Sequence, residues 1–438
     1  MVWYEAALLM IGGLLFLMFF GMPVAIAFLA INIVGVYIFM GGMIGIDQLV
    51  ANATTSVTSF ALVPVPLFLI MGELLFHTGL AIRVFDALDK CFGGIKGRLS
   101  YLTVGGGTIF ATLSGSSMAN TAMLGTTLMP DMIKRGYKPH MIMGPILATG
   151  GLAMIIPPSS LAVLLGSLAR IDVGALLIAG LVPGLLLAAL FIATIRMQIA
   201  LDPEAAPGYA AERARFPEIA RALLVDVLPM GIVVFAVVGL ILLGWATPTE
   251  SAAFGALSVV VLAACYRTLS WEAVVRSLTG TLKVSAMMLM IIVGSTTFSQ
   301  ILAFSGASSG LIAFATSFEL NAYVVLAVMF LVLLLLGMFM DQLSIMMLTL
   351  PIFMPLVSLY GFDQIWFGVV MLLALELSLA TPPFGLLLFV MVGVSPAGTT
   401  IGQVARAALP YIACTLLLVV LLALFPQLAL WLPGLIRS

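Results

Sequence analysis

Asp341 is the residue of this sequence that most strongly indicates a functional site, because it lies inside a long apolar run. A carboxylate in such surroundings is costly and is expected to be retained for a function. Gln342 and Ser344 follow it within three residues and supply further oxygen atoms. Oxygens of carboxylates, amides and hydroxyls are the ligands that hard cations prefer, so this stretch predicts a cation site.

A second oxygen-rich stretch occurs in the first half of the chain, where the sequence reads Ser114-Gly-Ser-Ser-Met-Ala-Asn120. Two other apolar segments are interrupted by proline pairs, Pro157-Pro158 and Pro382-Pro383. A proline pair removes two backbone donors, which leaves carbonyl oxygens of the preceding turn free to bind a cation. We therefore predict one Na⁺ site at each stretch, with ligands drawn from Ser114, Ser116, Ser117, Asn120, Pro157, Asp341, Gln342, Ser344, Thr381 and Pro382.

An anion site is predicted between the two cation sites, since helices that begin at the two stretches direct the positive ends of their dipoles inward. The candidate residues for it are Gly115, Pro158, Ser159, Ser160, Ser295, Thr296 and Pro383. Ordinary structural roles compete with this interpretation. Small residues such as Gly115 allow close helix packing, a proline pair can simply kink a helix, and the Ser295 and Thr296 hydroxyls can bond to their own helix.

Three glutamates also lie in apolar sequence context. Glu73 lies near the end of an apolar run, and Glu250 follows a turn, where it can cap a helix. Glu376 lies deeper in its run and could carry protons or pair with an arginine. The sequence leaves open whether Glu73, Glu250 or Glu376 takes part in the function.

Composition defines the elements that must position these residues. The chain is 63% hydrophobic and only 8% charged, and apolar runs long enough to cross a bilayer recur along it. We therefore expect an all-α polytopic membrane protein. A net charge of −1 excludes a basic surface for nucleic acid. The three cysteines have no metal-ligand spacing, and the N-terminus has no basic region typical of a removable signal peptide.

Lys and Arg gather in a few stretches, which the positive-inside rule places in the cytoplasm. Three spans, over 5–20, 23–42 and 61–76, precede the first basic stretch, so the N-terminus is expected outside. Residues 99–133 lie between two basic stretches, which predicts a hairpin that enters and returns with its tip at membrane depth. Two short ordinary spans joined by a tight turn are the alternative.

The remaining predicted elements follow in chain order: a broken helix over 141–169, a span over 174–195, a cytoplasmic connection over 196–223, spans over 224–244 and 250–266, an interfacial helix over 268–283, a span over 284–303, a second hairpin over 320–358, a broken helix over 364–395 and a last span over 409–433. A second hairpin is expected because 320–358 lies between two outside loops.

An internal repeat relates the two halves. Pro23 and Pro248 are related by a numbering offset of 225, as are the two proline pairs and the turns at Gly136 and Gly361. The segment Leu128–Met132 matches Thr349–Phe353 at an offset of 221 instead. We predict a first repeat over 1–195 and a second, oppositely oriented repeat over 224–438. Inverted repeats with broken helices are the architecture of secondary transporters.

Several separated strings resemble the large permease (M) subunit of tripartite ATP-independent periplasmic (TRAP) transporters: Leu113–Asn120, Gly125–Met132, Met154–Ser160, Thr247–Ala252 and Ala380–Gly385. The resemblance covers essentially the whole chain. It implies Na⁺-coupled transport of a small carboxylate, such as a C4-dicarboxylate or sialic acid, across the bacterial inner membrane. It also implies an elevator mechanism, in which a transport domain with both hairpins slides against a scaffold, and no cofactor besides the coupling ion.

The same resemblance implies two partners, a small four-helix membrane subunit (Q type) and a periplasmic substrate-binding protein (P type). The sequence contains no phosphate-binding loop and no arrangement of catalytic residues, so we expect a transporter and not an enzyme. A stand-alone dicarboxylate or citrate symporter without a binding protein is the alternative within transport. An ion channel and a membrane scaffold protein are the alternatives outside it.

Overall fold

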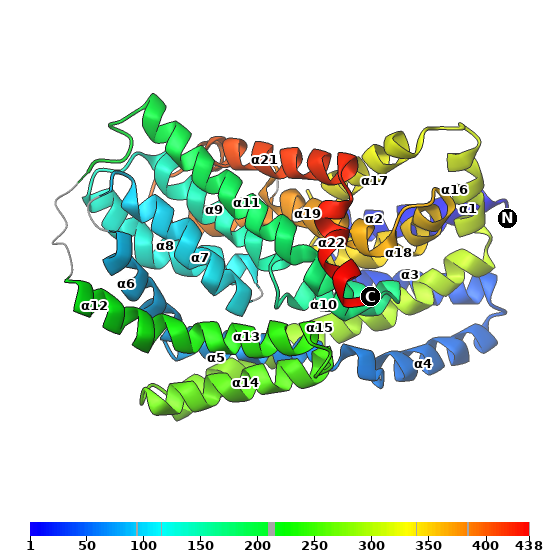
Figure 1. Cartoon of the computed structure of the whole chain (residues 1–438). Coiled ribbons are helices and arrows are strands. Elements are labelled where there is room, and N and C mark those ends of the chain that lie inside the picture. The colour runs from blue at the N-terminus through cyan, green and yellow to red at the C-terminus, as the bar shows by residue number, and fades with distance from the viewer. Residues whose placement is uncertain (93–94, 115, 209–214, 339, 383–384, 438) are drawn as a thin grey trace.

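The computed structural model describes residues 1–92, 95–114, 116–208, 215–338, 340–382 and 385–437, and within these ranges the chain is helical with no strand (Figure 1). The first half contains α1 (Trp3–Ala7), η1 (Leu8–Gly12), α2 (Gly13–Phe19), α3 (Val24–Phe39), α4 (Met43–Val57), η2 (Phe60–Leu62), α5 (Pro64–His77), α6 (Leu80–Phe92), α7 (Arg98–Ser114), α8 (Ser117–Lys134), α9 (Pro139–Ile155), α10 (Ser160–Ala169) and α11 (Val173–Leu201).

The second half contains α12 (Phe216–Ala222), η3 (Leu223–Val227), α13 (Leu228–Leu242), α14 (Pro248–Cys265), α15 (Trp271–Phe304), α16 (Ala307–Thr316), α17 (Ala322–Leu336), α18 (Gln342–Leu359), α19 (Gln364–Ala380), α20 (Leu386–Val394), α21 (Ile401–Leu424) and α22 (Gln427–Arg437). Within the described ranges, seven helices are individually long and apolar enough to span a membrane. The prediction of an all-α polytopic membrane protein is therefore confirmed.

Two pairs of helices recur along the chain with the same spacing. α8 begins at Ser117 and α18 at Gln342, so their starts differ by 342 − 117 = 225 in the numbering. The starts of α9 and α19 differ by 364 − 139 = 225, and their ends have the same offset. The spacing predicted from the proline pairs thus also relates whole helices.

One predicted match within the repeat differs in spacing from the helix boundaries. α8 and α18 have the same length and begin 225 residues apart, and this spacing pairs Pro130 with Pro355, because 355 − 130 is 225. The offset of 221 had paired Pro130 with Pro351 instead. α18 contains prolines one helical turn apart, at 351 and 355, so the sequence pattern alone did not distinguish the two registers.

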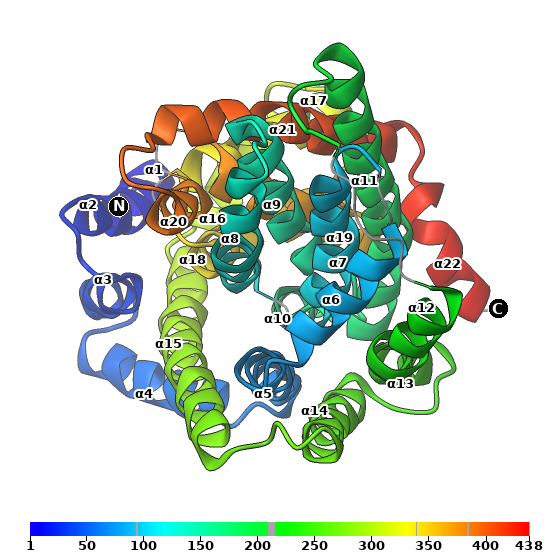
Figure 2. The ribbon, with the colours of Figure 1, turned by 90° about the vertical axis from the view of Figure 1, so that its left-hand side faces the viewer.

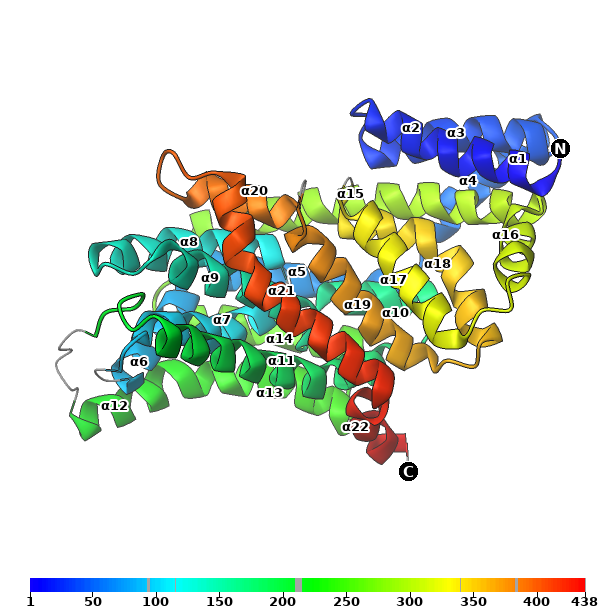
Figure 3. The same ribbon diagram turned by 90° about the horizontal axis from the view of Figure 1, so that it is seen from above.

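The two hairpins lie in opposite halves of the molecule (Figures 1 and 3). α7 packs against α8 at one end, and α17 packs against α18 at the other. Between them lie α9 and α19, which Figure 2 shows near the middle of the bundle. Every residue of α9 from Met141 onward is buried, as is every residue of α19 from Ile365 to Leu379. The buried centre of the protein is therefore formed by the two helices that precede the proline pairs.

Both of these central helices are followed by a break. α9 and α10 are bent by 42° at the segment between them. Ser159 caps the new helix, since its Oγ accepts a hydrogen bond from the Ala162 N–H at 3.2 Å. α19 ends at Ala380, and α20 begins at Leu386. Each central helix thus ends shortly before the position of its proline pair in the sequence, and a second helix begins beyond it.

The first half contains a helix that was not expected. α4 lies between the predicted spans over 23–42 and 61–76, and it contains Asp47, Gln48 and Asn52, which lower its hydrophobicity. Figures 1 and 3 show α4 and α5 following one another along the length of the bundle. When the repeat offset of 225 is added to their residue numbers, α4 corresponds to 268–282 and α5 to 289–302. Both ranges lie almost entirely within α15. The two short helices therefore occupy the position that one 34-residue helix fills in the second half.

α15 also corrects two predicted boundaries. An interfacial helix over 268–283 and a span over 284–303 were expected, but one continuous helix runs from Trp271 to Phe304. Charged residues in its first turns, including Arg276, had suggested an end at the membrane surface. The predicted last span over 409–433 is instead divided between α21 and α22, on either side of Pro426.

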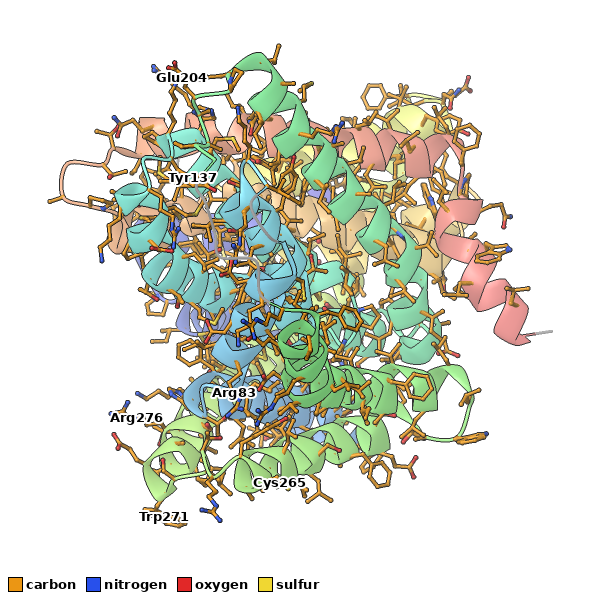
Figure 4. The ribbon with its side chains drawn as sticks, turned by 60° about the vertical axis from the view of Figure 1, so that its left-hand side comes forward. Arg83, Tyr137, Glu204, Cys265, Trp271 and Arg276 are labelled. Carbon is orange, nitrogen blue, oxygen red and sulfur yellow. The ribbon has the colours of Figure 1, made fainter. Side chains whose placement is uncertain are left out.

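Basic side chains gather at one end of the bundle. Arg83 of α6 pairs with Asp226 of η3 at 2.9 Å, and Lys138 before α9 pairs with Asp202 after α11 at 2.5 Å. Figure 4 turns this end toward the viewer and labels Arg83 on it. The N-terminus lies at the opposite end in Figure 1.

Candidate functional site

Two helix N-termini meet at the centre of the molecule, and each is capped by a side chain predicted to belong to the site. Ser116 caps α8, because its Oγ accepts a hydrogen bond from the Ala119 N–H at 3.3 Å. Asp341 caps α18, and its Oδ2 accepts hydrogen bonds from the N–H groups of Leu343 and Ser344 at 3.1 and 3.4 Å. The Ser344 hydroxyl also donates to Asp341. Both tips therefore present the positive end of a helix.

A cavity of about 280 Å³ lies between these tips. Its polar lining consists of Ser116, Ser117, Ser160, Asp341, Gln342 and Glu73. The first tip, the first break and the second tip, which are far apart in sequence, all contribute to this set. None of the described side chains that line the cavity is Lys or Arg. The volume suits a small ligand of a few heavy atoms.

Glu376 links the two tips from outside the cavity. Its Oε2 accepts a hydrogen bond from the Ser117 hydroxyl at 2.8 Å and another from Gln342 Nε2 at 3.2 Å. Ser117 and Gln342 are the first residues of α8 and α18 and occupy equivalent positions in the repeat. Sequence reasoning noted Glu376 but did not place it at the site, because nothing in the sequence showed that both tips reach the same carboxyl.

Two buried oxygens on α8 have no hydrogen-bond partner. The Asn120 amide donates from Nδ2 to the Thr149 carbonyl at 3.0 Å, but its Oδ1 is buried and unpartnered. The Thr121 hydroxyl is likewise buried without a partner. Unpartnered buried oxygens are costly, and a hard cation such as Na⁺ would satisfy them. Thr121 was missed, although it lies one helical turn after Ser117 and so shares its face.

Backbone carbonyls converge at the second break. A Cβ built on Gly385 would lie 2.4 Å from the Leu379 oxygen and 2.9 Å from the Thr381 oxygen, so only glycine fits there. The Thr381 hydroxyl donates to the Leu377 carbonyl at 2.6 Å and does not line the central cavity. Pro382 follows it in a half-buried turn. Thr381 donates to the Leu377 and Ser378 carbonyls, so the candidate ligands at this break are the Leu379 and Thr381 oxygens beside Gly385.

The atoms available as ligands around the tips indicate which kind of cation could bind there. Hydroxyl, amide, carboxylate and carbonyl oxygens surround the tips, and no group of three or more His, Cys, Asp or Glu side chains in the described part of the chain could hold a metal ion. All-oxygen sites of this kind suit alkali and other hard cations, whereas transition metals favour nitrogen and sulfur.

Some predicted site residues lie elsewhere. Pro157 and Pro158 pack against α11 and α13 and so face away from the cavity. The Ser295 hydroxyl donates to the Met347 carbonyl at 3.1 Å, and the Thr296 hydroxyl pairs with Ser56 at 2.8 Å. The structure therefore places both within helix contacts of α15.

The remaining predicted site residues lie, in sequence, at the first hairpin tip and beside the two proline pairs. Gly115 and Pro383 lie outside the described residues. Ser114 is the last residue of α7. Ser159 is fully buried as the cap of α10, and Ser160 beside it reaches the cavity.

Paired helical hairpins, broken central helices and a cavity at their junction define a membrane transport protein. Residues 11–428 match the sequence-family model described as the tripartite ATP-independent periplasmic transporter, DctM component. The chain belongs to this family, as its sequence motifs predicted.

Named relatives agree with this assignment, and a solved structure shares the fold. The C4-dicarboxylate TRAP transporter large permease protein DctM of Pseudomonas aeruginosa is 31% identical over 86% of each chain. The sialic acid TRAP transporter large permease protein SiaM of Vibrio cholerae is 29% identical over 97% of each chain. The crystal structure of the Alcanivorax borkumensis YdaH transporter superposes with a TM-score of 0.63 at 16% identity, over 90% of each chain. That last likeness supports the fold.

Proposed function

We propose that this chain is the permease of a Na⁺-coupled symporter that carries a small carboxylate across the bacterial inner membrane. The observation that carries the proposal is the central cavity, where both tips present helix N-termini and oxygen ligands to one space. Two relatives are named for C4-dicarboxylate and sialic acid transport, and both of those substrates are carboxylates.

The charges around the cavity explain why transport should require a cation. Asp341 and Glu73 both line the cavity, and no described lining residue is Lys or Arg. An anionic substrate alone would be repelled by these carboxylates. Na⁺ bound at the tips would offset that repulsion and, together with the helix N-termini, hold the carboxylate. Ion and substrate would thus bind in a mutually dependent way.

The arrangement of helices supports an elevator mechanism with inverted halves. The boundaries of α8 and α18, and of α9 and α19, repeat at a numbering offset of 225, and the two hairpins occupy opposite halves of the bundle (Figure 3). We assign α7–α10 and α17–α20 to the moving transport domain, and α3, α4 and α13–α15 to the scaffold. The basic end would face the cytoplasm, and the N-terminus would then lie at the periplasmic end.

Family membership supports two partners for this permease. One is a small four-helix membrane subunit, and the other is a periplasmic protein that delivers the substrate. Because the second partner binds the substrate first, it would largely determine which carboxylate is carried.

Uptake into proteoliposomes tests the proposal. The permease and its small subunit are reconstituted, and a panel of labelled carboxylates is supplied under an imposed inward Na⁺ gradient. We expect uptake of at least one carboxylate that requires both Na⁺ and the binding protein. Uptake of free substrate without the binding protein would favour a stand-alone symporter. Unsaturable flux that ignores the gradient would refute symport.

A further inference from the structure

The central cavity has one wall made of helix starts. Four helices, α8, α10, α18 and α20, begin at it, because their first residues, Ser117, Ser160, Gln342 and Leu386, all line the cavity. A helix N-terminus carries the positive end of the helix dipole. These four helices follow the two hairpin tips and the two breaks, so this wall suits an anionic group of a ligand.

The other wall is formed by α5 and α15, which pack against each other. Figure 2 shows α5 below α8, α10, α18 and α20. The two helices contribute Glu73 and apolar side chains such as Val284 and Met288 to the lining. Among their described lining residues, Glu73 alone is charged. The cavity is therefore polarised, with positive helix ends on one side and a carboxylate on the other.

The Glu73 carboxylate is held in place but is only partly engaged. Its Oε2 lies 3.2 Å from Nε2 of His77, one turn later on the same helix. The carboxylate also lies against Gly280 of α15, where a Cβ would be 2.8 Å from Oε2 and 3.1 Å from Oε1. His77 is its one polar partner among the described residues, so Oε1 remains for a ligand.

Asp341, the other carboxylate of the cavity, differs in this respect. Its Oδ2 accepts from the N–H groups of Leu343 and Ser344, and the Ser344 hydroxyl donates to its Oδ1. The start of α18 thus engages both oxygens and offsets their charge. Glu73 lies within α5, away from any helix start. It is therefore the carboxylate that a ligand must satisfy.

The chemistry of a carboxylate limits what can bind next to Glu73. An ionised carboxylate accepts hydrogen bonds and donates none. A second carboxylate on the ligand would face a like charge, and no described lining residue is Lys or Arg to separate the two. An ammonium or hydroxyl group would instead donate to Glu73. A hydrogen bond to a charged group changes affinity by about ten- to 150-fold.

We propose that Glu73 is a specificity-determining residue that selects carboxylates with a hydrogen-bond donor, an ammonium or a hydroxyl group, at the end remote from the carboxylate. The carboxylate of the ligand binds toward the four helix starts, and the donor binds to Glu73. Dicarboxylates are disfavoured. This inference rests on the proposed function, because it names the substrate class of the same cavity.

Three four-carbon acids of similar size test the selection. Succinate, 4-hydroxybutyrate and 4-aminobutyrate differ at one end, which is a carboxylate, a hydroxyl or an ammonium group. The purified full chain is titrated with each acid in Na⁺, and affinity is measured from the rise in melting temperature. We expect both donor-bearing acids to bind at least about tenfold more tightly than succinate, and 4-aminobutyrate most tightly. Equal affinities, or tighter binding of succinate, would overturn the proposal.

Variants assign the selection to Glu73. Glu73→Gln keeps the size of the side chain but removes its charge and adds a donor, so the affinities for succinate and 4-aminobutyrate should come within about threefold of each other. Glu319→Gln makes the same change at an exposed site outside the cavity and should retain the wild-type ratio. Gly280→Ala keeps the charge but displaces the carboxylate, so it should also lower the ratio. An unchanged ratio in Glu73→Gln would contradict the assignment.

The wild-type ranking needs no variant, so the test stays decisive if a substitution impairs folding. If Na⁺-driven uptake of succinate equals that of 4-aminobutyrate, the inference about Glu73 fails and the transport function stands. If the acids bind in the expected order but none is taken up, the transport function fails and the assignment of Glu73 stands. If no acid raises the melting temperature in Na⁺ and none is taken up, both fail.

Discussion

Gly385 provides a direct test of whether the carbonyls at the second break bind Na⁺. A Cβ at this position would lie 2.4 Å from the Leu379 oxygen and 2.9 Å from the Thr381 oxygen. Real Cβ atoms do not approach backbone oxygens so closely, so Gly385→Ala must push the two carbonyls aside. Overpacking of this kind costs about 1–3 kcal/mol. If these carbonyls are ligands and must return to their original positions to bind Na⁺, that cost would reduce Na⁺ affinity by up to about 150-fold.

The assay is the Na⁺ concentration that gives half-maximal uptake in proteoliposomes. Gly393→Ala is the matched control, because this glycine lies on the adjacent helix α20 and a Cβ there would meet nothing within 4 Å. Alanine is also favoured over glycine within a helix, so the control should behave as wild type. Thermal unfolding with and without Na⁺ separates affinity from stability, since a bound ion stabilises the folded state. An unchanged Na⁺ requirement in Gly385→Ala would refute a carbonyl site at the second break.

Three further predictions concern other parts of the molecule. Asp341→Asn retains an effective helix cap but loses the charge. The Na⁺ concentration for half-maximal uptake should therefore rise about tenfold, with little change in melting temperature. An unchanged Na⁺ titration of uptake would count against Asp341 as a ligand. The Asn52 amide of α4 donates to Gln300 of α15 at 2.7 Å. Asn52→Leu removes this hydrogen bond and should lower the free energy of unfolding by about 1–3 kcal/mol, measured by thermal unfolding. Equal stability would show that the contact is dispensable. Lys138 holds the pKa of Asp202 below its usual value, so the pairing should stabilise the fold fully above about pH 4, and this stabilisation should be lost as the pH falls further. The melting temperatures of the wild type and of Asp202→Asn should therefore converge in acid. A constant difference between them would contradict the assignment.

The sequence predicted the features that depend on local chemistry. Proline pairs necessarily interrupt helices, and the helices do break at 156–159 and after Ala380. Polar residues inside apolar runs indicated the tips, and Ser116, Ser117, Asp341 and Gln342 do line one cavity. The spacing of 225 between landmarks also separates the starts of α8 and α18 and of α9 and α19, because prolines and glycines fix the positions of turns.

Features that depend on three-dimensional packing could not be predicted in this way. α4 was missed because its polar residues lower its hydrophobicity, yet Gln48 and Asn52 are satisfied by one another and by Gln300 of α15. Charged residues at the start of α15 resembled an interfacial helix, although the helix continues without interruption. The role of Glu376 as a shared acceptor appears only when both tips are brought to α19.

The difference between α15 and its counterpart, the jointed pair α4 and α5, has a consequence for energetics. Perfectly matched halves would make the two alternating orientations of a transporter equal in free energy. Here one half contains a continuous helix of 34 residues, whereas the other is interrupted between Val57 and Pro64. A continuous helix and a jointed pair resist bending differently, so under the proposed alternation the two orientations need not be equal in free energy. The resting population would then favour one side of the membrane before any ligand binds.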